Sequence, residues 1–184
     1  MPGSKDLLTT TSFHMEVSTV TVLETAKKMI DYSHGNLHDI NHFMKVYAYA
    51  KMIADGEQLD PDTQKLVEMT ALVHDIACPL CRVKYGNTNG KNQEKESAAL
   101  IAEFFKDSNL PQDFTDRISF LVSHHHTLDQ IDGIDYQIII EADYLVNADE
   151  SHFSGHNIKN MYDKIFKTET GKFLLRSMYQ NCLE

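Results

Sequence analysis

The sequence predicts an all-α protein, and three observations support this fold class. After residue 15, apolar residues recur at intervals of three and four along almost the whole chain, which is the period of an amphipathic helix. Alternating β-branched runs are few, and residues that cap helices stand at the ends of the apolar segments. The length of 184 residues fits one domain. We therefore expect a flexible leader over residues 1–15 and a single helical domain over residues 16–184.

The first two helices are expected over residues 18–32 and 36–54, with Ser18 and Asn36 as their N-caps. A glycine follows each of these segments, as is typical of a helix end. The apolar stripe of the second helix includes His42, so we expect this imidazole to face the interior.

The third helix has the clearest start signal. Asp60 can cap it, and Pro61 costs no hydrogen bond at the first helical position. Pro79 is expected to end this helix. The following residues, 80–91, include two glycines and two asparagines and are expected to form a loop.

The rest of the chain is also expected to be helical. The run Ile138–Ile140 could be a short strand, but its acidic neighbours favour a buried helix, with Glu141 on that helix's surface. The expected helices are 93–106, 111–126, 134–149, 155–167 and 170–182. Apolar residues of the last two are expected to join the core, with a homodimer interface as the alternative: Met161, Ile165, Phe166, Phe173, Leu174, Leu175 and Met178.

The charge balance excludes two classes of partner. With 17 basic and 27 acidic residues, the net charge is −10, so we expect no nucleic acid polymer and no membrane surface as partners. A small anionic substrate stays compatible, because a metal or a local basic pocket can override the overall sign. The three cysteines, together with the lack of an apolar signal segment or an apolar spanning segment, predict a cytoplasmic protein.

Imidazoles and carboxylates stand in apolar helical contexts at several places. His74 and Asp75 end an apolar helix, and Asp143 follows an isoleucine run. Burying these groups is costly unless something pairs with them, and a metal cation would do so. The alternative is a set of hydrogen-bonded core residues. The adjacent histidines 124–126 cannot all converge on one centre, because successive helical residues point about 100° apart.

The ordered set of these residues resembles the HD superfamily of metal-dependent phosphohydrolases. His42, followed by Lys45 and Val46, is similar to that family's first motif, LVHDIA to its central motif and EADYL to its last motif. The resemblance covers about residues 20–150 and implies an HD-domain helical bundle. It also implies four metal ligands, which are His42, His74, Asp75 and Asp143.

Some branches of that family hold two metals, and the resemblance extends to them in part. His124 and His125 match the later histidine positions of these branches. A further position, usually histidine, is matched here by Glu94, with Glu96 as the alternative. A carboxylate at this position would favour a harder ion such as Mn or Fe.

The resemblance implies hydrolysis of a phosphate ester or anhydride of a small molecule, with a nucleotide expected. The expected cofactor is one or two divalent ions of Mn, Fe, Co or Zn, with Mg as a further candidate. Such an ion lowers the pKa of a bound water to about 7 and so supplies a hydroxide that attacks phosphorus. With two ions, Asp75 is expected to bridge them and to be catalytic.

Cationic side chains near the central motif are candidates for binding the substrate. His38 is a candidate phosphate contact and general acid, or else a hydrogen-bonded helix residue. Arg82, Lys84 and Lys91 are candidate phosphate contacts, with a solvated loop as the alternative. The pair Cys78 and Cys81 is expected to be packing rather than a redox motif. Two other functions stay open: an HD-type di-iron oxygenase, and a non-catalytic module that senses a nucleotide or a metal.

Overall fold

The computed structural model describes residues 19–183, and every regular element in this range is a helix, which confirms the all-α prediction. The expected leader over residues 1–15 lies outside the described residues. No helix in the described range is both long and apolar enough to cross a bilayer. The helices are α1 (Val22–Tyr32), α2 (Leu37–Gly56), α3 (Pro61–Val73), α4 (Cys78–Tyr85), α5 (Gly90–Phe105), α6 (Gln112–Val122), α7 (Ile134–Glu150), α8 (Gly155–Lys164), α9 (Glu169–Met178) and α10 (Gln180–Leu183).

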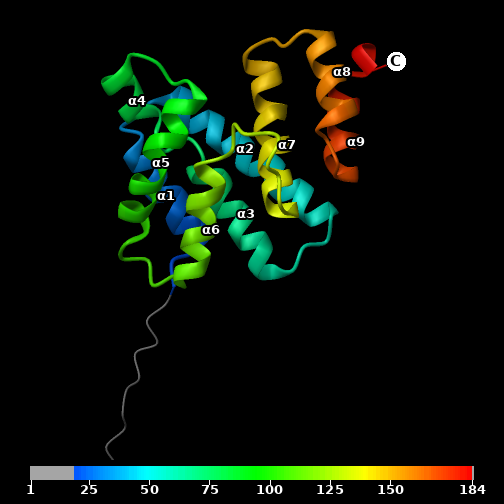
Figure 1. The fold of residues 1–184 in the computed structure, drawn as a ribbon. Helices are drawn as coiled ribbons and strands as arrows, with labels where there is room; N and C mark the ends of the chain where they lie inside the picture. The colour runs from blue at the N-terminus through cyan, green and yellow to red at the C-terminus, as the bar shows by residue number, and fades with distance from the viewer. Residues whose placement is uncertain (1–18, 184) are drawn as a thin grey trace, which may run out of the picture.

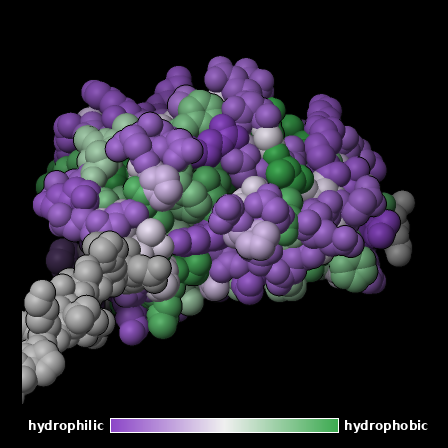
Figure 2. All heavy atoms as spheres, turned by 90° about the horizontal axis from the view of Figure 1, so that it is seen from below, coloured by the Kyte–Doolittle hydropathy of each residue, from purple (hydrophilic) through white to green (hydrophobic). Residues whose placement is uncertain are grey.

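Helices α2, α3 and α7 form the centre of the bundle and pack against one another. They contribute to two groups of buried side chains, one shared with α8 and α9 and the other with α1, α5 and α6. Figure 1 shows α8 and α9 on one side of α7, and α4, α5 and α6 on the other side of the molecule. The face drawn in Figure 2 is largely hydrophilic, with small hydrophobic groups between the polar side chains.

Helix α7 is buried on nearly all sides, and this confirms that the isoleucine run is helical. Every residue from Tyr136 to Val146 is buried, as expected of a helix that is packed all round. Glu141 is fully buried as well, so its expected surface position is wrong. Its carboxylate accepts hydrogen bonds from the backbone N–H groups of Lys167 and Thr168, at 2.6 and 3.0 Å. These bonds tie the start of α9 to the centre of the bundle.

The starts of the first three helices follow capping chemistry. Asn36 and Asp60 cap α2 and α3 as predicted. The first helix starts at Val22 instead, because Thr21 and Glu24 form a capping box in which each side chain accepts from the other's backbone N–H. Ser18, the predicted cap, lies outside the described residues.

The predicted loop over residues 80–91 is wrong in its first half. Helix α3 ends at Val73, before Pro79, and a turn leads into α4. Pro79 lies in the first turn of α4, where a missing N–H and a fixed φ cost nothing. Gly86, with φ of 70°, ends this short helix in the left-handed conformation. His74 and Asp75 therefore lie in the turn between two helices.

The C-terminal apolar residues divide between the core and the surface. Met161, Phe166 and Leu175 are buried, whereas Phe173 and Met178 are exposed. Two more pack against the core while partly buried: Ile165 and Leu174. The homodimer stays a prediction.

Candidate metal centre

Four side chains from three segments converge at the middle of the bundle. His42 comes from α2, Asp143 from α7, and the adjacent pair His74 and Asp75 from the turn after α3. The Nε2 atom of His42 lies 3.3 Å from His74 Nε2, 3.5 Å from Asp75 Oδ2 and 3.3 Å from Asp143 Oδ1. The Nε2 atom of His74 lies 3.6 and 3.5 Å from the same two oxygens.

These separations match those of ligands around a single ion. Ligand atoms bound at about 2.0–2.2 Å to a tetrahedral ion lie roughly 3.3–3.6 Å apart. Nδ1 of His74 lies 2.8 Å from the carbonyl oxygen of Ala71, and Nδ1 of His42 lies 2.8 Å from Oε2 of Glu150. Because each Nδ1 faces an acceptor and must donate, both Nε2 atoms turn a lone pair toward the centre. Two lone pairs and two carboxylates that face one another require a cation.

The shifted pKa values of these residues in the metal-free protein also indicate a site for a positive charge. Burial lowers the pKa of His42, but the carboxylates of Asp143 and Asp75 outweigh it and raise this pKa to about 9. Burial raises the pKa of Asp75, but the imidazoles of His74, His125 and His42 together outweigh this and hold the pKa well below its usual range. A proton on His42 therefore takes the place of a metal ion, and the residues present fit a divalent cation.

A second group of possible ligands shares Asp75. Nε2 of His125 lies 3.6 Å from Asp75 Oδ1. A ring nitrogen of His126 lies within 4.8 Å of a carboxylate oxygen of Asp75 and of a ring nitrogen of His125. His125 donates from Nδ1 to the carbonyl oxygen of Val122 at 2.8 Å, and its buried Nε2 has no partner among the described residues. Asp75 thus offers one oxygen to each group of ligands.

The structure places His126, rather than the predicted His124, beside Asp75. Helix α6 ends at Val122, and the three histidines lie in a turn instead of continuing the helix to residue 126. The turn leaves His124 stacked on Phe120, with 4.4 Å between ring centroids. Its Nδ1 donates to the carbonyl oxygen of Phe120 at 2.7 Å. His124 therefore lies outside the centre.

Neither glutamate predicted near the second ion belongs to the second group of possible ligands. Glu94 accepts a hydrogen bond from Thr127 at 2.8 Å, and Glu96 pairs with Lys84 at 2.8 Å. Gln93 instead lines a polar cavity over the metal centre, and its buried side-chain oxygen, Oε1, has no hydrogen-bond partner among the described residues. One residue along a helix rotates a side chain by about 100°, so the carboxamide of Gln93 lines the cavity while the neighbouring Glu94 does not. Sequence reasoning missed it by considering only charged groups there.

A polar cavity of about 240 Å³ opens over the metal centre. Arg82 lines it and is held by two hydrogen bonds to Asp39, at 2.7 and 2.6 Å. His38 lines it as well, with a side chain that is 75% exposed. Of the other predicted phosphate contacts, Lys84 pairs with Glu96 outside the cavity, and Lys91 is exposed away from it. Of the four predicted phosphate contacts, His38 and Arg82 therefore line the cavity.

Sequence reasoning also missed the residues that orient the ligands. Asn147 donates to Asp143 Oδ1 at 2.7 Å, and Glu150 accepts from both His42 and Lys45, at 2.8 and 3.0 Å. Their spacing in the sequence could have indicated this role, because Asn147 and Glu150 follow Asp143 by four and seven residues and so lie on the same helix face.

The two cysteines that follow the central motif, Cys78 and Cys81, are free and buried, and Cys78 lines the polar cavity. Burial, followed by the carboxylate of Asp75, raises the pKa of the Cys78 thiol well above its usual range. The thiol is therefore protonated at neutral pH and unreactive as a nucleophile.

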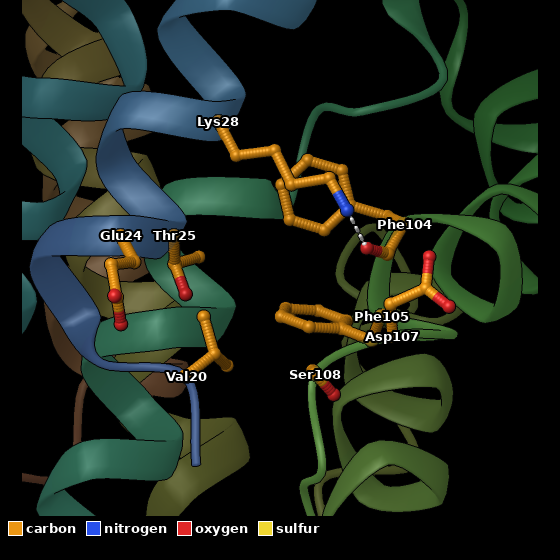
Figure 3. Close-up of a pocket in the computed structure, with 8 residues that line it drawn as sticks. All are labelled: Val20, Glu24, Thr25, Lys28, Phe104, Phe105, Asp107 and Ser108. Carbon is orange, nitrogen blue, oxygen red and sulfur yellow. Dashed lines mark hydrogen bonds between the residues drawn. The ribbon is translucent and has the colours of Figure 1, made fainter. Parts of the chain in front are cut away.

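A separate cavity of about 310 Å³ lies between α1 and the end of α5 (Figure 3). Lys28 reaches across it, donates to the carbonyl oxygen of Phe104 and lies 4.6 Å from the centroid of that ring. None of the predicted ligands lines this cavity. The metal centre is thus distinguished by its chemistry and not by the size of its cavity.

Comparison with known proteins agrees with this geometry. A family model, the HD domain, matches residues 39–149, a range that contains all four converging ligands. A solved structure of a predicted HD superfamily hydrolase from an uncultured Thermotogales bacterium is similar in fold, with a TM-score of 0.61 and 20% identity. The match covers 87% of this chain and 84% of that one. No curated protein matches the chain. Because the family model spans more than half of its length, the chain belongs to the HD domain family.

Proposed function

We propose that this protein is a metal-dependent phosphohydrolase that cleaves a phosphate ester or anhydride of a small molecule, with nucleotides as the leading substrate class. The observation that carries the proposal is the convergence of His42, His74, Asp75 and Asp143 beneath an open polar cavity that also holds Arg82. The mixed nitrogen and oxygen ligands suit Mn, Fe, Co or Zn. Such an ion, when bound, supplies an activated water and neutralises charge on the phosphoryl oxygens.

Asp75 is the residue best placed to serve two ions. Its Oδ2 faces His42 and His74 at 3.5 and 3.6 Å, and its Oδ1 faces His125 at 3.6 Å. A carboxylate in this position can bridge two ions, with His126 and Gln93 completing the second set of ligands. The neutral carboxamide of Gln93 would add no charge to that set.

Arg82 and His38 would bind and orient the phosphate. Asp39 holds the guanidinium of Arg82 at the edge of the cavity, and Arg82 can present its remaining N–H groups to phosphoryl oxygens. The exposed imidazole of His38 can rotate toward the oxygen of a leaving group and donate a proton to it.

The test is phosphate release from a panel of nucleotides and phosphate esters, with metal-stripped protein reloaded with Mn, Co, Fe or Mg. We expect metal-dependent release that Asp75→Ala abolishes. Asp113→Ala, on the exposed first turn of α6, is the matched control and should retain activity. Tight nucleotide binding without release would contradict the proposal and favour a sensor module. Iron-dependent consumption of oxygen would contradict it and favour an oxygenase.

A further inference from the structure

A second cavity of about 240 Å³ adjoins the polar cavity of the metal centre. His126, Asp143 and Asn147 line both cavities. The second cavity therefore lies directly beside the metal centre. Most of its other lining is apolar or aromatic, and we call it the apolar recess; these residues are Leu128, Ile140, Tyr144, Phe153 and Met161.

The charges divide the two cavities between two parts of a ligand. Arg82 lines the polar cavity, whereas the described lining of the apolar recess includes no lysine or arginine. The recess carries the carboxylate of Asp143 at its border. The polar cavity also carries the carboxylates of Asp39, Asp75, Asp143 and Glu150. An anionic group is therefore favoured there only between Arg82 and the cation that the ligands would hold, and an uncharged group is favoured in the recess.

The walls of the recess suit a planar ring. The rings of Tyr144 and Phe153 lie 5.6 Å apart between centroids, at an angle of 43°, and offer faces and edges for stacking. The side chains of Leu128, Ile140, Phe153 and Met161 offer no hydrogen bonds. A sugar or another polyol placed against them would lose hydrogen bonds to water.

One polar group in the recess has a defined orientation. The hydroxyl of Tyr144 donates to Oδ1 of Asn157 at 2.6 Å. The carboxamide is thereby fixed with its Nδ2 group as a donor, and no acceptor for that group is found within the described part of the chain. Asn157 can therefore recognise a carbonyl oxygen or a ring nitrogen.

We infer that the apolar recess binds an uncharged heteroaromatic ring of the substrate, whose phosphate lies at the metal centre beside Arg82. The preferred substrates are then ring-bearing phosphates such as nucleotides, in preference to sugar phosphates. The inference rests on the proposed function, because the phosphate end is placed by the metal centre.

The experiment compares kcat/KM for nucleoside 5′-monophosphates with kcat/KM for ribose 5-phosphate. Both kinds of substrate release phosphate from the primary hydroxyl on C5 of ribose, so a difference in kcat/KM reports the ring. We expect the wild-type protein to favour nucleotides by about tenfold or more. Phe153→Ala and Asn157→Ala should each raise KM for nucleotides severalfold and leave ribose 5-phosphate unchanged. Phe173→Ala, an exposed phenylalanine on α9, is the matched control and should change neither.

The outcomes separate the inference from the proposed function. Equal kcat/KM for ribose 5-phosphate and nucleotides would overturn the inference while phosphate release upheld the function. If no substrate releases phosphate, the function fails, and calorimetric binding of adenosine and uridine to Mn-loaded protein then tests the recess. Binding that Phe153→Ala weakens would support the recess, and no binding would overturn it. Circular dichroism checks folding, and the exposed Asn157→Ala serves if Phe153→Ala does not fold.

Discussion

Nδ1 of His42 donates a hydrogen bond of 2.8 Å to Oε2 of Glu150, so the last residue of α7 orients a proposed metal ligand on α2. Lys45 holds the other oxygen of Glu150 at 3.0 Å. This contact fixes both the tautomer of His42 and the direction of its lone pair. It links two residues that are 108 positions apart in the sequence.

Removing this contact is expected to weaken metal binding. Glu150→Gln should lower the affinity for Mn or Co by about 10- to 100-fold, because the carboxamide no longer strengthens the imidazole as a ligand. Competition with a chromogenic chelator measures the affinity. Glu103→Gln, at an exposed position on α5, is the control. An affinity equal to that of the wild type would show that Glu150 has no such role.

Metal stoichiometry can test whether His126, and not His124, belongs to the second group of possible ligands. His126→Ala should reduce the amount of metal bound per chain toward one equivalent, because His126 faces Asp75. His124→Ala should leave the stoichiometry unchanged, since its ring stacks on Phe120. Elemental analysis of reloaded and dialysed protein gives the ratio. The reverse pattern in the two variants would restore the original prediction.

Arg82 and Lys84 are two positions apart and should behave differently. Arg82→Ala should raise KM by about tenfold or more with a smaller change in kcat, because the guanidinium binds phosphate before and during the reaction. Lys84→Ala should leave both constants near the wild-type values, because Lys84 pairs with Glu96 outside the cavity. Steady-state kinetics on one nucleotide suffices. Equal effects of the two substitutions would contradict the assignment.

The stability of the metal-free protein should fall as pH rises. The pKa of His42 is raised from 6.5 to about 9 in the folded state. The stabilisation that this provides is complete below the unfolded pKa of 6.5 and is lost as pH rises through about 9. Melting temperatures of chelator-treated protein from pH 6 to 9.5 should therefore decrease. His42→Gln should flatten this dependence, and a profile that is identical in both proteins would refute the assignment.

Glu141 is expected to be important for stability rather than for chemistry. Glu141→Ala removes the acceptor of the Lys167 and Thr168 backbone N–H groups, and each buried donor left unpaired costs about 1–3 kcal/mol. We expect the free energy of unfolding to fall by about 2–4 kcal/mol. Urea denaturation measures it, with Glu103→Ala as the exposed control. A loss below about 0.5 kcal/mol, the size expected for an ordinary surface change, would disprove the role.

Local chemistry was sufficient to predict much of this protein. Helical periodicity and caps such as Asn36 and Asp60 depend on neighbouring residues, so they can be read along the chain. Carboxylates and imidazoles in apolar helical contexts need a partner, which made them candidate ligands. The resemblance to the HD superfamily then supplied the set of four. The short helix α4 was missed because Pro79 is read as a terminator, although it is equally suited to a first turn.

Which neighbouring side chain faces the centre was decided by the tertiary structure alone. Gln93 instead of Glu94, and His126 instead of His124, depend on where a helix ends and on how it is rotated against its neighbours. Each residue along a helix turns a side chain by about 100°, so an error of one position changes the group at the site. The sequence by itself determined most of the helices, their apolar faces and the type of ligands. Packing determined the rotation of each helix, because only contacts between helices resist that rotation.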